Sequence, residues 1–291
     1  MRTCERRWIG IAMASVMCAA VLVSAVAADD AALGREIAAK WGNAVVRVML
    51  VVKIGMSYGG SSDTRENKSE VTGTVVDPSG LTVVSLAAAN PADTYSQMMG
   101  SEERSELTSE VTDVKIRSSD GTEIPAKIVL RDKDLDLAFI RPAQKLASPA
   151  VALDLKESSA ADMLDQVMIL HRLGKVANRA LFGSLERIQA VVEKPRKFYV
   201  VGLSGPEAPF GAPVFAMNGK PVGIVLLRTM PGQSAGLGSM FGGTSDMGII
   251  PVVVPAEDIA AVAAQAPEEA PKEPAKPAKP AAPAKPPKPK G

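Results

Sequence analysis

The chain has 291 residues, a formal net charge of +1 and a hydrophobic content of 46%. This length and composition suffice for one large hydrophobic core or two small ones, while the near-neutral charge excludes a strongly basic nucleic-acid-binding protein. The single histidine, His171, limits every mechanism that needs an imidazole.

The N-terminus has the layout of a secretory signal peptide, predicted over residues 1–27. Three arginines precede an apolar run that ends in Ala25-Val26-Ala27, a small-x-small cleavage pattern. The alternative is an uncleaved anchor, since the run is near the length that spans a membrane. Both cysteines, Cys4 and Cys18, lie in this segment, so the cleaved chain would have neither disulfides nor a thiol nucleophile. We expect an exported protein, periplasmic or extracellular and associated with the cell envelope, with no transmembrane segment after cleavage.

Short strands dominate the predicted domain, residues 28–265. A helix is predicted over residues 31–41 and a strand over 44–52, followed by a polar loop, YGGSSDTRENKSE. Next comes a hairpin, GTVVDPSGLTVVSL, whose Pro-Ser-Gly sequence at residues 78–80 is typical of a tight turn. Further strands are predicted at DVKIRSS, EIPAKIVL, LDLAFIRP, QVMIL, ALFGSLERIQAVV, FYVVGLS, APVFAM, KPVGIVLLR and MGIIPVVV.

The predicted strands fall into two equal sets on either side of a looser stretch, residues 143–160. Many short strands at near-regular spacing favour a sandwich or barrel, and two equal sets favour two barrels. We therefore predict an all-β fold of two six-stranded barrels, the first over about 44–141 and the second over about 166–254. A final helix is predicted in PAEDIAAVAAQ, with Pro255 in its first turn.

The C-terminal segment, residues 266–291, consists mainly of Pro, Ala and Lys. This composition offers little to bury and predicts a disordered tail or spacer. The later half of the tail is purely basic, so weak attraction to an anionic cell-wall or membrane surface is the functional alternative.

Four blocks of the sequence have recognisable turn and strand patterns: VTGTVVDPSGLTVVSLAAAN, SSDGTEIPAKIVLRDKDLDLAFI, APFGAPVFAMNGKPVGI and MGIIPVVVPAEDI. In this order they resemble the signature blocks of the HtrA/Deg-type serine proteases. The resemblance covers roughly residues 35 to 262 and implies a trypsin-like double β-barrel. That family usually carries a peptide-binding PDZ domain after the barrels, where this chain has the Lys/Pro tail.

The resemblance also implies where a catalytic triad would lie. Ala87 occupies the position of the general-base histidine, Asp136 that of the orienting carboxylate, and Phe210 that of the nucleophilic serine. Around the nucleophile position, Ala208 and Pro209 replace Gly-Asn, and Ala212 replaces a glycine. Alanine accepts no proton and phenylalanine attacks no carbonyl, so these positions lack the chemistry of acyl transfer. Phe210 could plug the cleft, offer an apolar contact, or be an ordinary packed side chain.

Two other residues could supply the chemistry that these positions lack. Ser204, in GLSGPEA, lies in a sequence similar to a nucleophile turn, and His171 is the only available base. A loop serine and a structural histidine are the simpler interpretations, and Asp136 has its own structural interpretation as a carboxylate bonded to backbone amides. The acidic run from Ser101 to Glu110 is predicted to be a solvated loop, with weak cation or partner binding as the alternative. One histidine and no cysteine in the mature chain predict no metal site, and no cofactor motif is present.

The sequence thus predicts an exported pseudoprotease that binds a polypeptide or envelope partner. Two alternatives remain. The first is an active HtrA-like endopeptidase with a rewired site. The second is a structural or surface spacer that acts through its basic tail.

Overall fold

The computed structural model describes residues 30–58, 61–90, 106–229 and 249–268. The predicted signal peptide and almost all of the predicted tail lie outside the described residues. Within the described ranges, no helix is both long enough and apolar enough to cross a bilayer.

Twelve strands form two closed antiparallel barrels of six strands each, so the predicted all-β double barrel is confirmed. Hydrogen-bonded neighbours follow the order β1-β2-β3-β6-β5-β4 in the first barrel and the equivalent order β7-β8-β9-β12-β11-β10 in the second. The first barrel consists of β1 (Val45–Tyr58), β2 (Ser61–Val75), β3 (Thr82–Ser85), β4 (Glu106–Arg117), β5 (Glu123–Asp132) and β6 (Leu137–Pro142). The second consists of β7 (Gln166–Arg172), β8 (Leu181–Val192), β9 (Phe198–Val201), β10 (Pro213–Ala216), β11 (Pro221–Thr229) and β12 (Ile249–Pro255).

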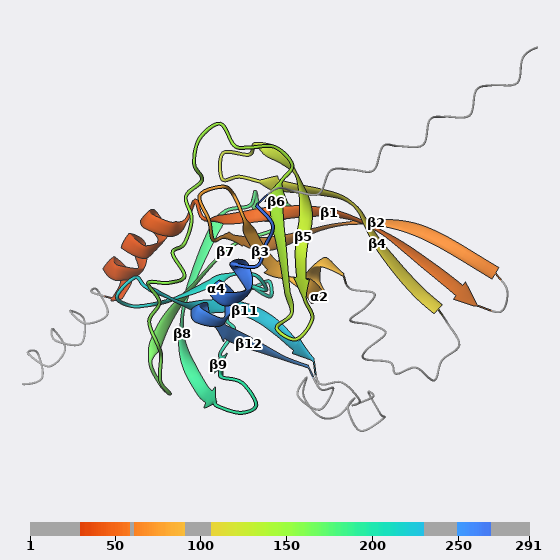
Figure 1. Ribbon diagram of the computed structural model, residues 1–291. Coiled ribbons are helices and arrows are strands. Elements are labelled where there is room, and N and C mark those ends of the chain that lie inside the picture. Colours follow the sequence, from red (N-terminus) through yellow and green to blue (C-terminus); the bar gives the residue numbers. More distant parts are fainter. Residues whose placement is uncertain (1–29, 59–60, 91–105, 230–248, 269–291) are drawn as a thin grey trace, which may run out of the picture.

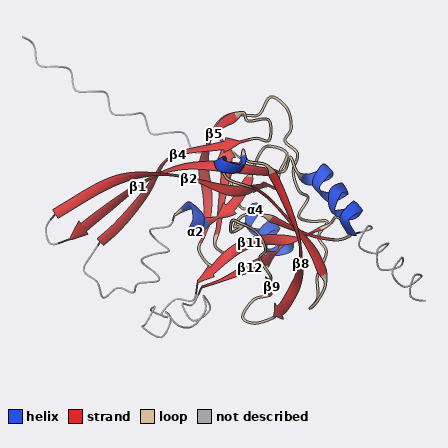
Figure 2. Ribbon diagram, turned by 180° about the vertical axis from the view of Figure 1, so that it is seen from behind, coloured by secondary structure: helices blue, strands red, loops and turns tan. Residues whose placement is uncertain are grey.

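The helices are few compared with the strands (Figure 2). A helix over residues 30–41 precedes β1, and α4 (Ala256–Ala263) follows β12 directly, with Pro255 as its N-cap. Two shorter elements, α2 (Leu86–Ala89) and the 3-10 helix η1 (Lys175–Ala177), follow β3 and β7. The two predicted helices therefore flank the barrels.

Three hydrophobic clusters account for the core. One fills the first barrel and one fills the second, while a third contains residues of both barrels, including Phe139 of β6 and Phe215 of β10. On β6, Leu137 and Phe139 belong to the shared cluster, while Ala138 and Ile140 belong to the first barrel's cluster. Successive side chains of a strand point to opposite faces, so β6 is buried on both sides and joins the two barrels.

The polar sequence YGGSSDTRENKSE is not the loop predicted for it. Strands β1 and β2 continue as a paired hairpin out to Tyr58 and Ser61, and β4 pairs with β1 along the same arm. The arm extends away from the barrels, on the side opposite the N-terminal helix (Figure 1). Glu106 to Glu110 of the acidic run belong to β4, so the predicted solvated loop is wrong there; residues 101–105 lie outside the described part. Hydrogen bonds between the backbones stabilise these strands, and neither face of the arm is buried. The sequence therefore lacks the alternation of apolar and polar residues that would predict a strand.

Candidate functional site

The hairpin of β2 and β3 carries Ala87 to the junction of the barrels. Its turn is closed by the Gly80 amide, which donates to the Asp77 carbonyl at 2.9 Å, and the φ of Gly80 is 92°. The backbone amide of Ser79 also donates to the Asp77 carboxylate at 2.7 Å. All four residues of β3 are buried, and the chain then enters α2, of which Ala87 is the second residue. The hairpin predicted from the sequence thus ends in a single helical turn.

Asp136 lies in the turn between β5 and β6, and its carboxylate binds three groups at the barrel junction. Oδ1 accepts a hydrogen bond from the Ala87 amide at 2.6 Å, and Oδ2 accepts one from the Ser85 hydroxyl at 2.6 Å. Oδ2 also accepts from the amide of Leu227, on β11 of the second barrel, at 3.0 Å. The Asp136 carbonyl accepts from the Leu86 amide at 2.9 Å. The structure therefore brings Ala87 and Asp136 into direct contact and ties both to the second barrel.

The backbone and the electrostatics of Asp136 are both unusual. Its φ is 57°, in the left-handed region that few non-glycine residues adopt. Burial raises the pKa of its carboxyl to about 6, although the hydrogen bonds from Ser85, Ala87 and Leu227 act in the opposite direction. A carboxylate that orients a catalytic histidine would have an imidazole beside it. Here the corresponding neighbour contributes a backbone amide and a methyl group.

Phe210 lies in a turn at the junction of the two barrels. The Ala212 amide donates to the Pro209 carbonyl at 2.9 Å, and the φ of Gly211 is 87°, as the third position of a type II turn requires. Gly211 is hydrogen-bonded to both barrels. Its amide donates to the Val225 carbonyl of β11 at 2.7 Å, and its carbonyl accepts from the Thr74 hydroxyl of β2 at 2.7 Å.

The side chain of Phe210 is half-buried and packs against the hydrophobic cluster of the second barrel. Of the three interpretations left open by the sequence, an ordinary packed side chain agrees best with these contacts. In this conformation the phenyl ring contributes to the core of the second barrel and supplies no nucleophile.

The structure does not pair Ser204 with His171. The Ser204 hydroxyl donates to Glu186 Oε2 at 3.3 Å, and the Ser204 amide donates to Glu186 Oε1 at 3.0 Å. His171, the penultimate residue of β7, is only 2% exposed, and its ring lies 4.8 Å from that of Phe182. Burial lowers the pKa of the His171 imidazole. These contacts agree with a loop serine bound to a carboxylate and a structural histidine.

Two partners of Asp136 were not identified from the sequence. Ser85 is the last residue of the buried strand β3, where a hydroxyl at the end of an apolar run was the only available signal. Leu227 lies 91 positions after Asp136 and binds it through the backbone amide, so the identity of its side chain could not have indicated this contact. Among the described residues, no group of three or more His, Cys, Asp or Glu side chains could hold a metal ion.

No protein-family model matches the chain, and the search of curated proteins finds no match. The two six-stranded antiparallel barrels are compatible with a trypsin-like fold, and the link to the HtrA family rests on the four sequence blocks alone.

Proposed function

We propose that this protein is an exported, catalytically inactive homologue of the HtrA-type serine proteases that binds a polypeptide or an envelope component. The observation that carries the proposal is the contact between the Asp136 carboxylate and the backbone of Ala87, where an active enzyme needs an imidazole. Phe210 at the nucleophile position packs into the second barrel, which agrees with the same conclusion.

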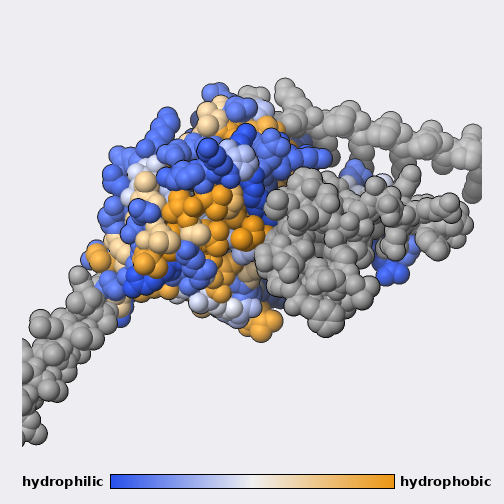
Figure 3. Space-filling model, turned by 90° about the horizontal axis from the view of Figure 1, so that it is seen from below, coloured by the Kyte–Doolittle hydropathy of each residue, from blue (hydrophilic) through white to orange (hydrophobic). Residues whose placement is uncertain are grey.

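Binding is the function that such a scaffold retains when the triad is missing. In proteases a substrate polypeptide lies across the junction of the two barrels, and here that junction keeps its hydrogen-bonded frame around Asp136. The face seen from below carries an area of apolar residues that hydrophilic residues border above and on the left (Figure 3). Exposed apolar areas bordered by polar residues are typical of protein–protein interaction sites.

Catalysis is tested by treating the full chain with a fluorophosphonate probe and with fluorescent casein. We expect neither covalent labelling nor hydrolysis, because the Ser204 hydroxyl, the candidate nucleophile that the sequence offers, donates to a carboxylate and is not paired with an imidazole. Ser204→Ala is the control. Labelling of the unmodified chain that disappears in Ser204→Ala would establish a rewired endopeptidase instead.

Binding is tested with the same casein, as fluorescence anisotropy against increasing protein. Ala87→Trp places a bulky side chain at the junction and should weaken binding, whereas Ala160→Trp, at an exposed position between the barrels, should not. Urea unfolding of both variants verifies that they remain folded. If casein binding survives Ala87→Trp but disappears on deletion of residues 266–291, the protein acts through its tail, and binding at the junction is refuted.

A further inference from the structure

A second site lies at the junction of the barrels, apart from Asp136. A pocket of about 220 Å³ is lined by four arginines that come from four different segments. Arg47 belongs to β1, Arg117 ends β4, Arg172 ends β7, and Arg179 follows η1. The first two belong to the first barrel and the last two to the second. Two serines, Ser118 and Ser119, with Asp120, Gly121 and Asn178, complete the wall.

Two carboxylates, Glu70 and Glu123, are each shared between two of the cations in and around the pocket. Glu70 accepts from Arg179 Nε at 3.1 Å and lies 3.8 Å from Arg47 Nε, and both guanidinium groups lower the pKa of its carboxyl, together with Arg117. Glu123 is likewise shared, by Arg117 at 2.9 Å and by Lys115 at 3.4 Å. The ionic groups in and around the pocket are the cations Arg47, Lys115, Arg117, Arg172 and Arg179 and the carboxylates Glu70, Asp120, Glu123 and Glu207.

Arg172 is held in place without a carboxylate partner among the described residues. Its Nε donates to the Val45 carbonyl at 2.7 Å, and its Nη2 donates to the Gly42 carbonyl at 2.8 Å. Burial is the only cause that shifts the pKa of its guanidinium, and it lowers that pKa. The charge of Arg172 is therefore positioned by backbone carbonyls and is not neutralised by a neighbouring side chain.

Arg47 gives the second indication of a ligand. Only 7% of this residue is exposed, yet it lines the pocket. Its terminal nitrogens donate to the Thr72 hydroxyl at 3.2 Å, the Arg172 carbonyl at 3.0 Å and the Glu70 carbonyl at 2.9 Å. Its Nε is buried and has no hydrogen-bond acceptor within the described part of the chain. A buried, charged donor without an acceptor is costly, and an oxyanion in the pocket would supply one.

The backbone on the second barrel's side of the pocket is in a rare conformation. Asn178 and Arg179 are consecutive non-glycine residues with φ values of 52° and 55°. Such conformations persist only where surrounding contacts impose them, and they are frequent at ligand sites. Here they direct the Arg179 guanidinium across to Glu70 on the first barrel.

We propose that this pocket binds a tetrahedral oxyanion, phosphate or sulfate, either free or as the head group of a larger ligand. Guanidinium groups form charge-assisted, often bidentate bonds with such anions. The four arginines approach from four segments, which suits an anion with acceptors in three dimensions better than a planar carboxylate. Bound in this way, the anion would bridge the two barrels.

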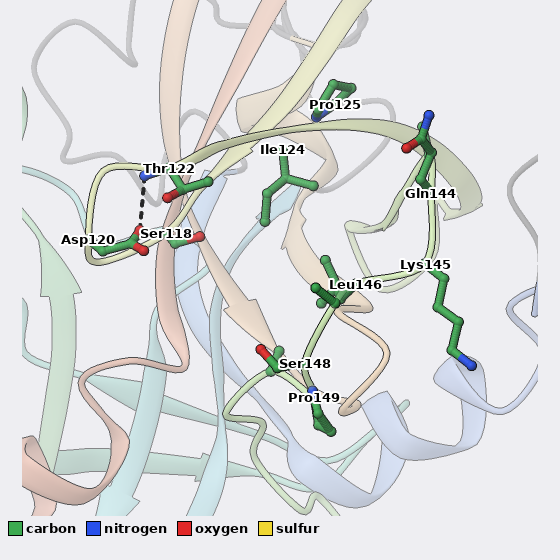
Figure 4. A pocket seen from close by; sticks show the side chains of 13 residues that line it. Ser118, Asp120, Thr122, Ile124, Pro125, Gln144, Lys145, Leu146, Ser148 and Pro149 are labelled. Atoms are coloured by element: carbon green, nitrogen blue, oxygen red, sulfur yellow. Dashed lines mark hydrogen bonds between the residues drawn. The ribbon is translucent and has the colours of Figure 1, made fainter.

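The turn that borders the pocket also borders a larger groove (Figure 4). This groove has a volume of about 510 Å³ and is lined in part by Ile124, Leu146 and Pro149, and Ser118 and Asp120 line both cavities. The Asp120 carboxylate accepts from the Thr122 amide at 2.9 Å, which fixes the turn between them. An organic phosphate could therefore place its head group among the arginines and an apolar part in the groove.

The test measures thermal unfolding of the full chain against increasing inorganic phosphate, sulfate or chloride at constant ionic strength. Phosphate and sulfate should raise the melting temperature saturably, and chloride should not. Arg117→Gln should weaken phosphate binding roughly tenfold or more, since one charge-assisted hydrogen bond is lost. Arg131→Gln, at an exposed position on β5, is the matched control and should bind as the unmodified chain does.

Two further measurements make the test independent of how well one variant folds. Asp120→Asn removes a carboxylate from the wall of the pocket, so it should tighten phosphate binding. Phenyl phosphate should bind more tightly than phosphate if the groove takes part, and equally if the ligand is the free ion. The proposal is overturned if no anion gives a saturable shift, or if Arg117→Gln and Asp120→Asn both bind phosphate like the control.

Discussion

Asp136→Asn is the substitution that best isolates the electrostatics of the barrel junction. Asparagine has nearly the same shape as aspartate but does not titrate between pH 3.5 and 8. Its amide would still meet Ala87, Ser85 and Leu227, although its NH₂ group would face at least one donor. That mismatch adds a constant destabilisation at every pH and leaves the pH dependence to report on the carboxyl group alone.

The magnitude follows from the raised pKa. The carboxyl of Asp136 has a pKa of about 6 in the folded protein, against an ordinary value of 3.8. Between these values the folded protein holds a proton that the unfolded chain has released, so the free energy of unfolding falls as pH rises. The stabilisation is fully present below pH 3.8 and lost above pH 6. With 1.36 kcal/mol per pKa unit, the loss amounts to about 3 kcal/mol.

The assay is urea unfolding of both proteins at intervals from pH 3.5 to 8, followed by subtraction of the two free energies of unfolding. The subtraction removes the contributions of all other titrating groups, including Asp77 and Glu70, whose lowered pKa values give the opposite slope in both proteins. The advantage of the unmodified chain over Asp136→Asn should shrink by about 3 kcal/mol between pH 4 and 7. A difference that is flat or that grows with pH would refute the reasoning, because it would mean that the hydrogen bonds outweigh burial.

Two further substitutions test other contacts at the junction by urea unfolding at neutral pH. Gly211→Ala should lower the free energy of unfolding by about 2 to 4 kcal/mol, because an added Cβ would lie 2.2 Å from the Thr72 carbonyl oxygen at a φ of 87°. Gly219→Ala, at a φ of 78°, should lower it by only about 1 kcal/mol, because the added Cβ would lie 3.8 Å from Ile37, an ordinary van der Waals contact. Equal losses would contradict the clash. Glu70→Gln should lower the free energy of unfolding by about 1 to 3 kcal/mol, because it leaves the guanidinium groups of Arg47 and Arg179 without their shared carboxylate. The control, Asp63→Asn, breaks an exposed ion pair and should leave the free energy of unfolding almost unchanged. A cost near zero for Glu70→Gln would show that the arginine pocket tolerates its positive charge without this group.

The strands with a buried face could be predicted from the sequence, and those without one could not. Segments such as the hairpin from Gly73 combine apolar residues with a recognisable turn, and all twelve predicted strands occur in the two barrels. The arm formed by the ends of β1, β2 and β4 has mostly exposed polar residues, so its backbone pairing left no periodic pattern. The resemblance to the HtrA-type proteases, counted along the hairpin and the segment before β6, also related Ala87 to Asp136, and these two residues are in contact.

The arginine pocket was missed because its members are separated along the chain. Arg47 interrupts the apolar start of β1, which is a visible anomaly, whereas Arg172 ends β7, and Arg47 donates to the Arg172 carbonyl 125 positions away. Neither residue indicates from its own neighbourhood that the other exists. Only the closure and packing of two barrels bring the four guanidinium groups together, so no local pattern could have predicted the site.

Under the proposed function, the contacts at the junction would account for a scaffold that folds without a triad. The residues that the resemblance places at the base and nucleophile positions are held through their backbones: the amide of Ala87 binds Asp136, and the turn containing Phe210 is closed by the hydrogen bond from the Ala212 amide to the Pro209 carbonyl. Leu227 likewise binds Asp136 through its amide. Backbone bonds do not depend on the identity of the side chain, so His and Ser at those positions are not required for the frame. What the frame does require is a carboxylate at position 136 and a glycine at position 211, and both residue types are present in this chain.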